Sequence, residues 1–213
     1  MYKTIFIDWN GTISSSKFWW HLEQSKKSED NKVFARIEKS LFGNLRETIK
    51  PWMLGELQSE DVIDKVAKDS KLEYDKVLKE FIKSCASMEI VSKDVLKLVS
   101  KIRKKGTKVV IATDNMDSFT RWTYPGLKLF NHFDGYLNSH YLHAMKGHKD
   151  DKGKSLFFRK YLISSGLKPN ESVLIDDSED KDNVIPSFGI DYIQIERNIG
   201  LVPSLKKLFS TYK

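Results

Sequence analysis

The chain has 213 residues, 40% of them hydrophobic, and a formal net charge of +7. This composition supports a sizeable core and excludes a disordered chain, and the length suits one large domain or a domain with an insert. No run approaches the roughly 18 consecutive apolar residues of a membrane span, and the first apolar run is too short for a secretory signal. The single Cys85 excludes an intramolecular disulfide and a cysteine-based metal cluster. We therefore expect a cytoplasmic protein with no membrane partner.

The excess of basic residues is spread along the chain, mostly at the spacing of helix surfaces. This pattern favours a solvated, lysine-rich surface, so nucleic acid is not expected as a partner. One local cluster is denser than the rest and consists of Lys146, Lys149, Lys152 and Lys154. The oligomeric state cannot be predicted from these features.

The first predicted element is a short strand, Thr4–Ile7, which ends abruptly at Asp8. Asn10 and Gly11 follow almost at once. Asp and Asn-Gly are ordinary turn residues at the end of a strand. A carboxylate at the open end of a parallel sheet is, however, also where α/β proteins bind ligands.

Residues 15–90 contain no convincing strand. Three helices are predicted there, Lys32–Phe42, Ser59–Lys68 and Tyr74–Cys85, and the last has its apolar residues on one face. We interpret 15–90 as an all-helical subdomain inserted into a core formed by 1–14 and 91–213. Its hinges are expected near 14–16 and 88–91.

The rest of the chain alternates short apolar runs with helical patterns. The predicted strands are Thr107–Thr113, Phe133–Leu137, Ser172–Asp176 and Asp191–Ile195. The predicted helices are one capped by Ser92 and ending near Gly106, a second at Leu156–Leu162, and a third at Leu201–Phe209. This alternation predicts an α/β fold with a Rossmann-like, doubly wound parallel sheet.

Three of the predicted strands end in polar side chains: Asp8, then Thr113 with Asp114, and finally Asp176 with Asp177. The carboxyl ends of parallel strands share one edge of the sheet, so these groups should meet in one crevice. Crowded carboxylates repel one another unless a cation joins them. An all-oxygen site of this kind suits Mg²⁺, which we expect as the cofactor.

Four segments in order resemble the motifs of the haloacid dehalogenase-like hydrolase superfamily. They are Asp8-Trp9-Asn10-Gly11-Thr12 (usually Asp-x-Asp-Gly-Thr), Val110–Thr113, Lys152-Gly153 before a helix, and Leu174–Ser178 with its acidic pair. The resemblance covers the whole chain, and the helical insert matches the cap that many members carry between the first two motifs.

The resemblance implies that Asp8 is the nucleophile of a phosphatase-like hydrolase and forms an aspartyl-phosphate with a small phosphorylated molecule. Lys152 and Mg²⁺ would supply the positive charge that this attack needs. Asp177 would bind the metal together with Asp8 and the carbonyl of Asn10, and Asp176 would be a second or outer acid.

The phosphoryl group would lie against the second motif and the loop after Asp8. Thr113 would donate its hydroxyl to a phosphoryl oxygen, with backbone N–H groups near Asp114 beside it. Gly11 would let the backbone approach the phosphate closely, and Lys152 would neutralise its charge.

Two assignments stay open. Counting back from the acidic pair favours Lys152 as the motif lysine, whereas counting forward from Ser139 reaches Lys146, and Lys154 is also near. Asp180, Asp182 or Asn183 could supply the further polar residue that many members place after the acidic pair.

The chain departs from the family at Asn10, where phosphatases carry the Asp that acts as general acid and then base. Asn10 keeps the backbone carbonyl but has no proton to donate, and such help is worth about 10²–10⁴-fold. The protein could be a slow phosphatase that favours acyl or aryl phosphates, could use His21 or Asp114 as the acid, or could bind a phosphorylated ligand without turnover. Dehalogenases and phosphonate-cleaving members replace this Asp with other residues.

The insert begins with aromatic residues that could select a leaving group. Trp19, Trp20 and His21 are the candidates for substrate specificity, since they could close over an apolar group. They could equally form the packing core of the helices.

Overall fold

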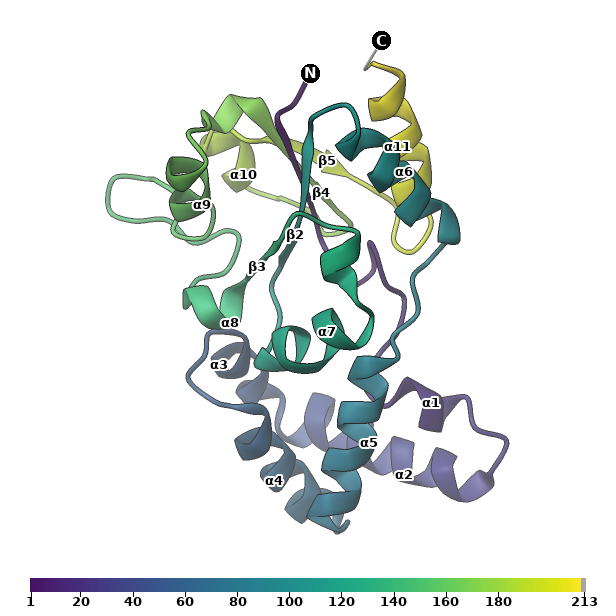
Figure 1. Ribbon diagram of the computed structural model, residues 1–213. Coiled ribbons are helices and arrows are strands. Elements are labelled where there is room, and N and C mark those ends of the chain that lie inside the picture. Colours follow the sequence, from purple (N-terminus) through teal and green to yellow (C-terminus); the bar gives the residue numbers. More distant parts are fainter. Residues whose placement is uncertain (212–213) are drawn as a thin grey trace.

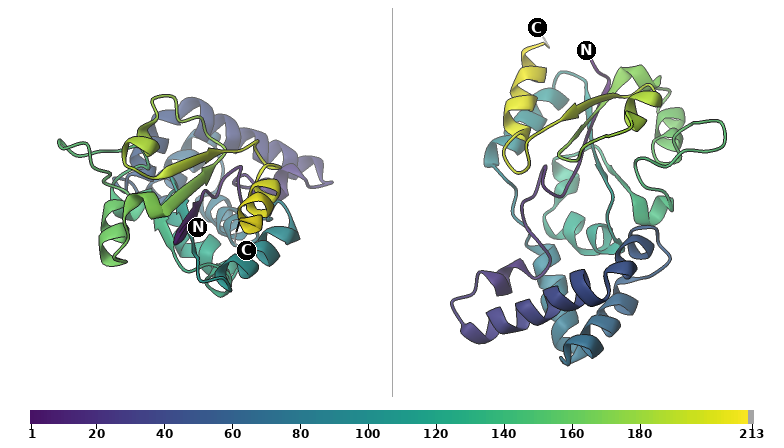
Figure 2. Two further views of the ribbon diagram at one scale, coloured as in Figure 1. Left: turned by 90° about the horizontal axis from the view of Figure 1, so that it is seen from above. Right: turned by 180° about the vertical axis from the view of Figure 1, so that it is seen from behind.

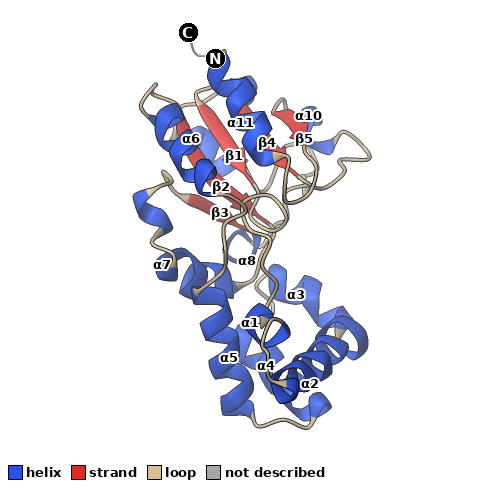
Figure 3. Cartoon of the chain, turned by 90° about the vertical axis from the view of Figure 1, so that its right-hand side faces the viewer, coloured by secondary structure: helices blue, strands red, loops and turns tan. Residues whose placement is uncertain are grey.

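A computed structural model describes residues 1–211. A sheet with flanking helices forms one end of the molecule, and a group of helices forms the other (Figures 1 and 3). Both chain termini lie at the far end of the sheet, away from the helical group (Figure 1).

The sheet contains five parallel strands in the order β3-β2-β1-β4-β5. They are β1 (Thr4–Ile7), β2 (Lys108–Thr113), β3 (Tyr136–Asn138), β4 (Ser172–Asp176) and β5 (Asp191–Gln194). The chain starts at the centre of the sheet and builds outward in both directions, which confirms the predicted Rossmann-like α/β fold. The carboxyl ends of the strands point toward the helical group (Figure 1).

Each central strand sends alternate side chains into two different cores, which is why these strands are apolar throughout. Ile5 and Ile7 pack with α6 (Lys93–Arg103) and α11 (Leu201–Ser210). Phe6, between them, packs on the opposite face with residues of α9 (Arg159–Ser164) and α10 (Val184–Ser187). Figures 1 and 2 show these two pairs of helices on opposite sides of the sheet.

Several predicted element boundaries agree with the structure, and others are shifted. The hydroxyl of Ser92 accepts a hydrogen bond from the Asp94 N–H and caps α6, as predicted. The helix expected at Leu156 begins only at Arg159, after a turn in which Phe157 and Phe158 are buried. The third strand begins at Tyr136 rather than at Phe133. Short helices after β2 and β3, α7 (Tyr124–Gly126) and α8 (Ser139–Leu142), were not predicted.

The segment predicted as all-helical contains helices, turns and loops and, apart from the bridge of Ile90 to Ser14, no strand residue among those described. It comprises α1 (Trp20–Glu23), α2 (Ser28–Glu38), α3 (Ile49–Met53), α4 (Ser59–Ser70) and α5 (Tyr74–Ala86). The helix expected at Lys32–Phe42 begins earlier, and a π-helical turn, Lys39–Asn44, follows it. These helices share a hydrophobic cluster of their own, which includes Trp19, Trp52 and Phe81.

Two sets of contacts join the helical segment to the sheet. The two connecting segments run side by side, with the Ser14 hydroxyl donating to the Glu89 carbonyl at 2.7 Å. On the other side, the fully buried Asp117 accepts hydrogen bonds from Trp52 Nε1 and Ser59 Oγ, both at 2.7 Å, and pairs with Arg121. These contacts hold the helical segment beside the carboxyl ends of the strands.

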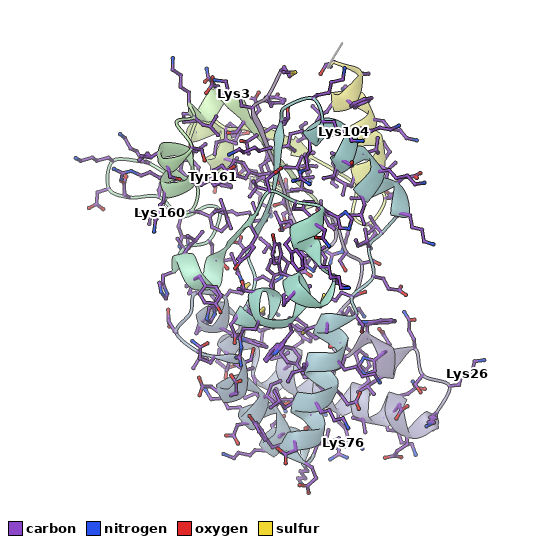
Figure 4. The ribbon with its side chains drawn as sticks, in the orientation of Figure 1. Lys3, Lys26, Lys76, Lys104, Lys160 and Tyr161 are labelled. Carbon is purple, nitrogen blue, oxygen red and sulfur yellow. The ribbon has the colours of Figure 1, made fainter. Side chains whose placement is uncertain are left out.

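The basic residues labelled in Figure 4 lie on separate parts of the surface. Lys3, Lys26, Lys76, Lys104 and Lys160 are all exposed and come from the sheet end, the helical segment and α9. In residues 1–211, no helix has both the length and the apolar character needed to span a membrane.

Candidate active site

The strand register brings the acidic residues together. Ile7 pairs with Ile111 of β2 and with Ile175 of β4, so the next residue, Asp8, lies level with Asp176. Asp8, Asp176 and Asp177 each offer an oxygen, and these oxygens lie within 4.8 Å of one another. Asp8 and Asp176 are buried. The strand ends therefore converge at one edge of the sheet.

Lys146 lies at the centre of this cluster. Its Nζ is 2.8 Å from Asp8 Oδ1 and also contacts Asp176 Oδ2. Burial raises the pKa of Asp8 to about 7, although the Lys146 charge opposes this. Burial also disfavours the Lys146 charge, but the attraction of Asp8, Asp176 and Asp114 outweighs it and raises the pKa of Lys146. The ammonium group is therefore held charged against the Asp8 carboxylate.

Asp177 is oriented from two sides. Thr12 Oγ1 donates to its Oδ1 at 3.3 Å, and Arg197 NH1 lies 2.9 Å from its Oδ2. The Asp177 side chain is only 6% exposed. Arg197 comes from the loop between β5 and α11 and was not predicted as a site residue.

The charges around the cluster suit a divalent cation. Among the described residues, the cations that pair with the carboxylates of Asp8, Asp176 and Asp177 are Lys146 and Arg197, and Lys146 and His148 lie near Asp114. The acids in this group therefore outnumber the lysine and arginine side chains that pair with them. Oxygen donors of this kind are those that Mg²⁺ prefers, so the residues fit the metal that the sequence predicts.

Gly11 is required by the close packing at this point. Its φ is +82°, and a Cβ there would lie 2.4 Å from Asp177 Oδ2 and 2.9 Å from Arg197 Cζ. A larger residue would therefore displace the acid that faces the cluster.

Gly11→Ala should lower stability and weaken the effect of Mg²⁺, because the new methyl group pushes Asp177 away. Gly153→Ala is a matched control, since Gly153 also has a positive φ, +72°, but has nothing within 4 Å of its Cβ position. Both should lose about 1–2 kcal/mol from backbone strain. Only Gly11→Ala should also lose most of the Mg²⁺-induced rise in melting temperature. Equal Mg²⁺ shifts in both variants would contradict this role.

The second strand contributes an unpaired hydroxyl. Thr113 is fully buried, and its Oγ1 has no hydrogen-bond partner among the described residues. An unsatisfied buried hydroxyl is costly, and this one, at the carboxyl end of β2 beside Asp114, is available to donate to a ligand. Its neighbour Asp114 accepts a hydrogen bond from the Lys146 N–H at 2.9 Å, and burial raises the pKa of Asp114.

Comparison with solved structures identifies the fold. A HAD family enzyme from Bacteroides thetaiotaomicron, in a variant crystallised with magnesium and inorganic phosphate, matches with a TM-score of 0.66 at 16% identity over 92% of this chain and 95% of that one. The chain has the haloacid dehalogenase-like (HAD-like) fold. A protein from Porphyromonas gingivalis described as a predicted HAD-like family hydrolase matches with a TM-score of 0.67 at 15% identity over 98% of both chains.

A third similar structure has a different chemistry. L-2-haloacid dehalogenase from Xanthobacter autotrophicus, with chloropropionic acid covalently bound, matches with a TM-score of 0.63 at 11% identity over 92% of this chain and 78% of that one. No family model matches the sequence, and none of the curated proteins matches it. These likenesses confirm the HAD-like fold.

The structure places Lys152, the predicted motif lysine, away from the acidic cluster. Lys152 is exposed, and its N–H donates to Asp150 in a loop outside the acidic cluster. Lys154 is exposed in the same loop, which a bridge between Lys149 and Ser155 closes. The loop adds residues between Lys146 and α9. Counting back along the sequence from the acidic pair therefore reaches Lys152 and not Lys146. Lys146, the alternative, is the residue that contacts Asp8.

The proposed later acidic residues do not join the cluster either. Asp180 accepts hydrogen bonds from the N–H groups of Val184 and Ile185 and thereby caps α10. Asp182 and Asn183 are exposed. Within residues 1–211, the acidic group that could hold a metal consists of Asp8, Asp176 and Asp177.

A cavity of about 240 Å³ lies between the HAD-like core and the helical segment. Asn10, Gly11 and Asp114 line its polar side, from the same loops that follow Asp8 and Thr113. The cavity therefore opens beside the predicted nucleophile, where a leaving group would lie.

The predicted specificity residues do not line this cavity. Trp19 is buried in the helical core and its Nε1 donates to the Val77 carbonyl at 3.1 Å, while His21 Nε2 lies 2.6 Å from Glu80 Oε2. Trp20, in α1, is also absent from the cavity wall. Phe18, one residue before this group, does line it, as does Phe42. The aromatic run thus serves mainly as helix packing.

Proposed function

We propose that the protein is a magnesium-dependent phosphatase-like hydrolase that acts on a small phosphorylated molecule. The observation that carries the proposal is the Asp8 carboxylate, held by Lys146 Nζ at 2.8 Å within the cluster of three acids. A similar structure bound with magnesium and inorganic phosphate supports it. We also propose that residues 15–90 form a cap on a core of 1–14 and 91–213.

In this mechanism an oxygen of Asp8 attacks phosphorus and the bond to the leaving oxygen breaks. The phosphoryl group is then carried on Asp8 and is released when water attacks it. Lys146 holds the attacking carboxylate in place and offers positive charge to the phosphoryl oxygens, and the unpaired Thr113 hydroxyl donates to one of them.

The Asp8 and Asp177 carboxylates and the Asn10 carbonyl would hold Mg²⁺, with Asp176 beside them. When bound, Mg²⁺ neutralises charge between the carboxylate and the phosphate. The buried Lys146 and the exposed Arg197 then balance the acids that remain.

A second function is favoured by Asn10. Its amide cannot donate a proton to a leaving alcohol or remove one from water, so the protein could bind a phosphorylated ligand without turning it over. In that case the same residues would form a phosphate receptor, and the helical segment would select the ligand.

An assay of acetyl phosphate and p-nitrophenyl phosphate with Mg²⁺ and with EDTA separates these functions. Hydrolysis that requires Mg²⁺ supports the phosphatase, and Mg²⁺-dependent binding of phosphate without hydrolysis supports the receptor. L-2-chloropropionate should be tested in parallel, since one similar structure is a haloacid dehalogenase. Halide release from it, with neither phosphate hydrolysed nor bound, would contradict the proposal.

Asn10→Asp should raise hydrolysis of alkyl phosphates by roughly 10²-fold, because the new carboxylic acid can protonate the departing alkoxide. The gain on aryl phosphates should be much smaller, since phenolate ions leave without a proton. Fresh protein is needed, and mass spectrometry of the Asn10 peptide should exclude deamidation of the Asn-Gly pair. Equal gains on both substrates would show that Asn10 does not limit leaving-group protonation.

A further inference from the structure

The cavity beside Asp8 is lined by apolar as well as polar side chains. The apolar ones, called here the wall, come from the helical segment and from the loop after β2: Phe18, Phe42, Met53, Met88 and Met116. Lys17 and Arg197 also line the cavity. A small ligand here would therefore meet both hydrocarbon and charge.

The two aromatic residues of the wall differ in how closely neighbouring side chains pack around them. Phe18 is held by rings on several sides, with centroid distances of 5.0 Å to Phe81 and 5.9 Å to Trp52. Phe42, in the π-helical turn, is 46% exposed, although large apolar side chains are usually covered. Phe42 is thus free to gain contact when a ligand covers it.

The methionines suit an aromatic ligand. Met88 and Met116 line the cavity and are 5% and 6% exposed, and Met88 Sδ accepts a hydrogen bond from Trp9 Nε1 at 3.5 Å. Thioether sulfur packs favourably against aromatic rings and adapts to their shape. An engineered apolar cavity of about 150 Å³ accepts benzene, so about 240 Å³ has room for one ring.

The polar side of the cavity restricts the chemistry of the leaving group. Asn10 lines the cavity and has no proton to transfer, and the carboxyl group of Asp114, which also lines it, accepts a hydrogen bond from the Lys146 N–H at 2.9 Å. A leaving oxygen that is stable as an anion needs no such donor. Aryl oxides meet this condition and alkoxides do not, and an aryl group is also what the apolar wall would cover.

We propose that this cavity receives the aromatic ring of an aryl phosphate monoester, an inference that rests on the proposed function. Asp8 forms a bond to phosphorus while the P–O(aryl) bond breaks, and the electron pair of the broken bond leaves on the phenolate oxygen. Water then attacks phosphorus, the P–O(Asp8) bond breaks, and the proton lost by water is taken up by the phenolate. The products are a phenol and hydrogen phosphate.

Calorimetric binding of phenylphosphonate and methylphosphonate with Mg²⁺ tests the ring site without turnover. Phenylphosphonate should bind about tenfold more tightly, because its ring is removed from water. Phe42→Ala should reduce that preference about three- to fivefold. Phe130→Ala is the matched control, since Phe130 is 56% exposed but does not line the cavity.

The outcomes separate this inference from the proposed function. Equal affinity for both phosphonates, or an equal loss in Phe42→Ala and Phe130→Ala, would overturn the aryl site and leave the phosphate site standing. If neither phosphonate binds, the proposed function itself fails, and the aryl site fails with it. Hydrolysis should follow the same pattern, with Phe42→Ala losing more activity on phenyl phosphate than on acetyl phosphate and Phe130→Ala unchanged on both.

Discussion

Asp8→Asn should lower phosphate ester hydrolysis by about 10⁴-fold or more, because the amide cannot attack phosphorus. The substitution preserves the size of a side chain that is only 5% exposed, so packing should change little. Steady-state rates with p-nitrophenyl phosphate and Mg²⁺ measure the loss.

Asp150→Asn is a suitable control, because Asp150 lies in the exposed loop outside the acidic cluster and should leave the rate unchanged. Circular dichroism and the melting temperature show whether Asp8→Asn is folded. A folded Asp8→Asn protein that retains more than a tenth of the activity would exclude Asp8 as the nucleophile.

Lys146→Met should cause the largest loss of stability. Lys146 is buried between Asp8 and Asp176, and removal of one partner from a buried ion pair typically costs about 3–5 kcal/mol. For a chain of this size the melting temperature should fall by roughly 10 °C. Mg²⁺ should restore part of the loss, because it offers positive charge to the same carboxylates.

Lys152→Met is the matched control, since Lys152 is exposed in the neighbouring loop and should lose less than about 0.5 kcal/mol. Phosphate binding should weaken in Lys146→Met and persist in Lys152→Met. A larger effect of Lys152→Met on phosphate binding would show that Lys146 is only a structural ion-pair partner.

The acidic residues could be predicted because they directly follow short apolar strands. Asp8, Thr113 and Asp176 adjoin β1, β2 and β4, and parallel strands bring such positions to one edge. The order of these motifs also predicted the fold correctly. These residues could be found from the sequence because each lies at the carboxyl end of a recognisable strand.

Lys146 could not be chosen from the sequence alone. Two Lys-Gly pairs, at Lys146 and Lys152, have similar local surroundings, and the choice depends on how far a loop extends from the sheet. The bridge between Lys149 and Ser155 closes the residues between them into a separate loop. No periodic pattern of apolar residues in the sequence reveals such a loop. Lys146 is identified only by its contact with Asp8.

The residues that form the cavity wall also could not be predicted from the sequence. Phe18, Phe42, Met53 and Met88 come from separate parts of the helical segment, and each alone looks like a packing residue. Arg197 follows the last strand in a loop with no motif, and only its contact with Asp177 marks it. Such residues meet through tertiary packing, so their function is visible only in three dimensions.

The most direct test of the account is a rapid-quench reaction with an aryl phosphate and Mg²⁺. Asn10 offers no base to activate the attacking water, so the second step should be slow and phosphoryl should accumulate on Asp8. The account predicts a burst of one phenol per protein, with the mass of one phosphoryl group added to the peptide that contains Asp8. Steady phenol release without a burst, and with no phosphoryl group on that peptide, would contradict it.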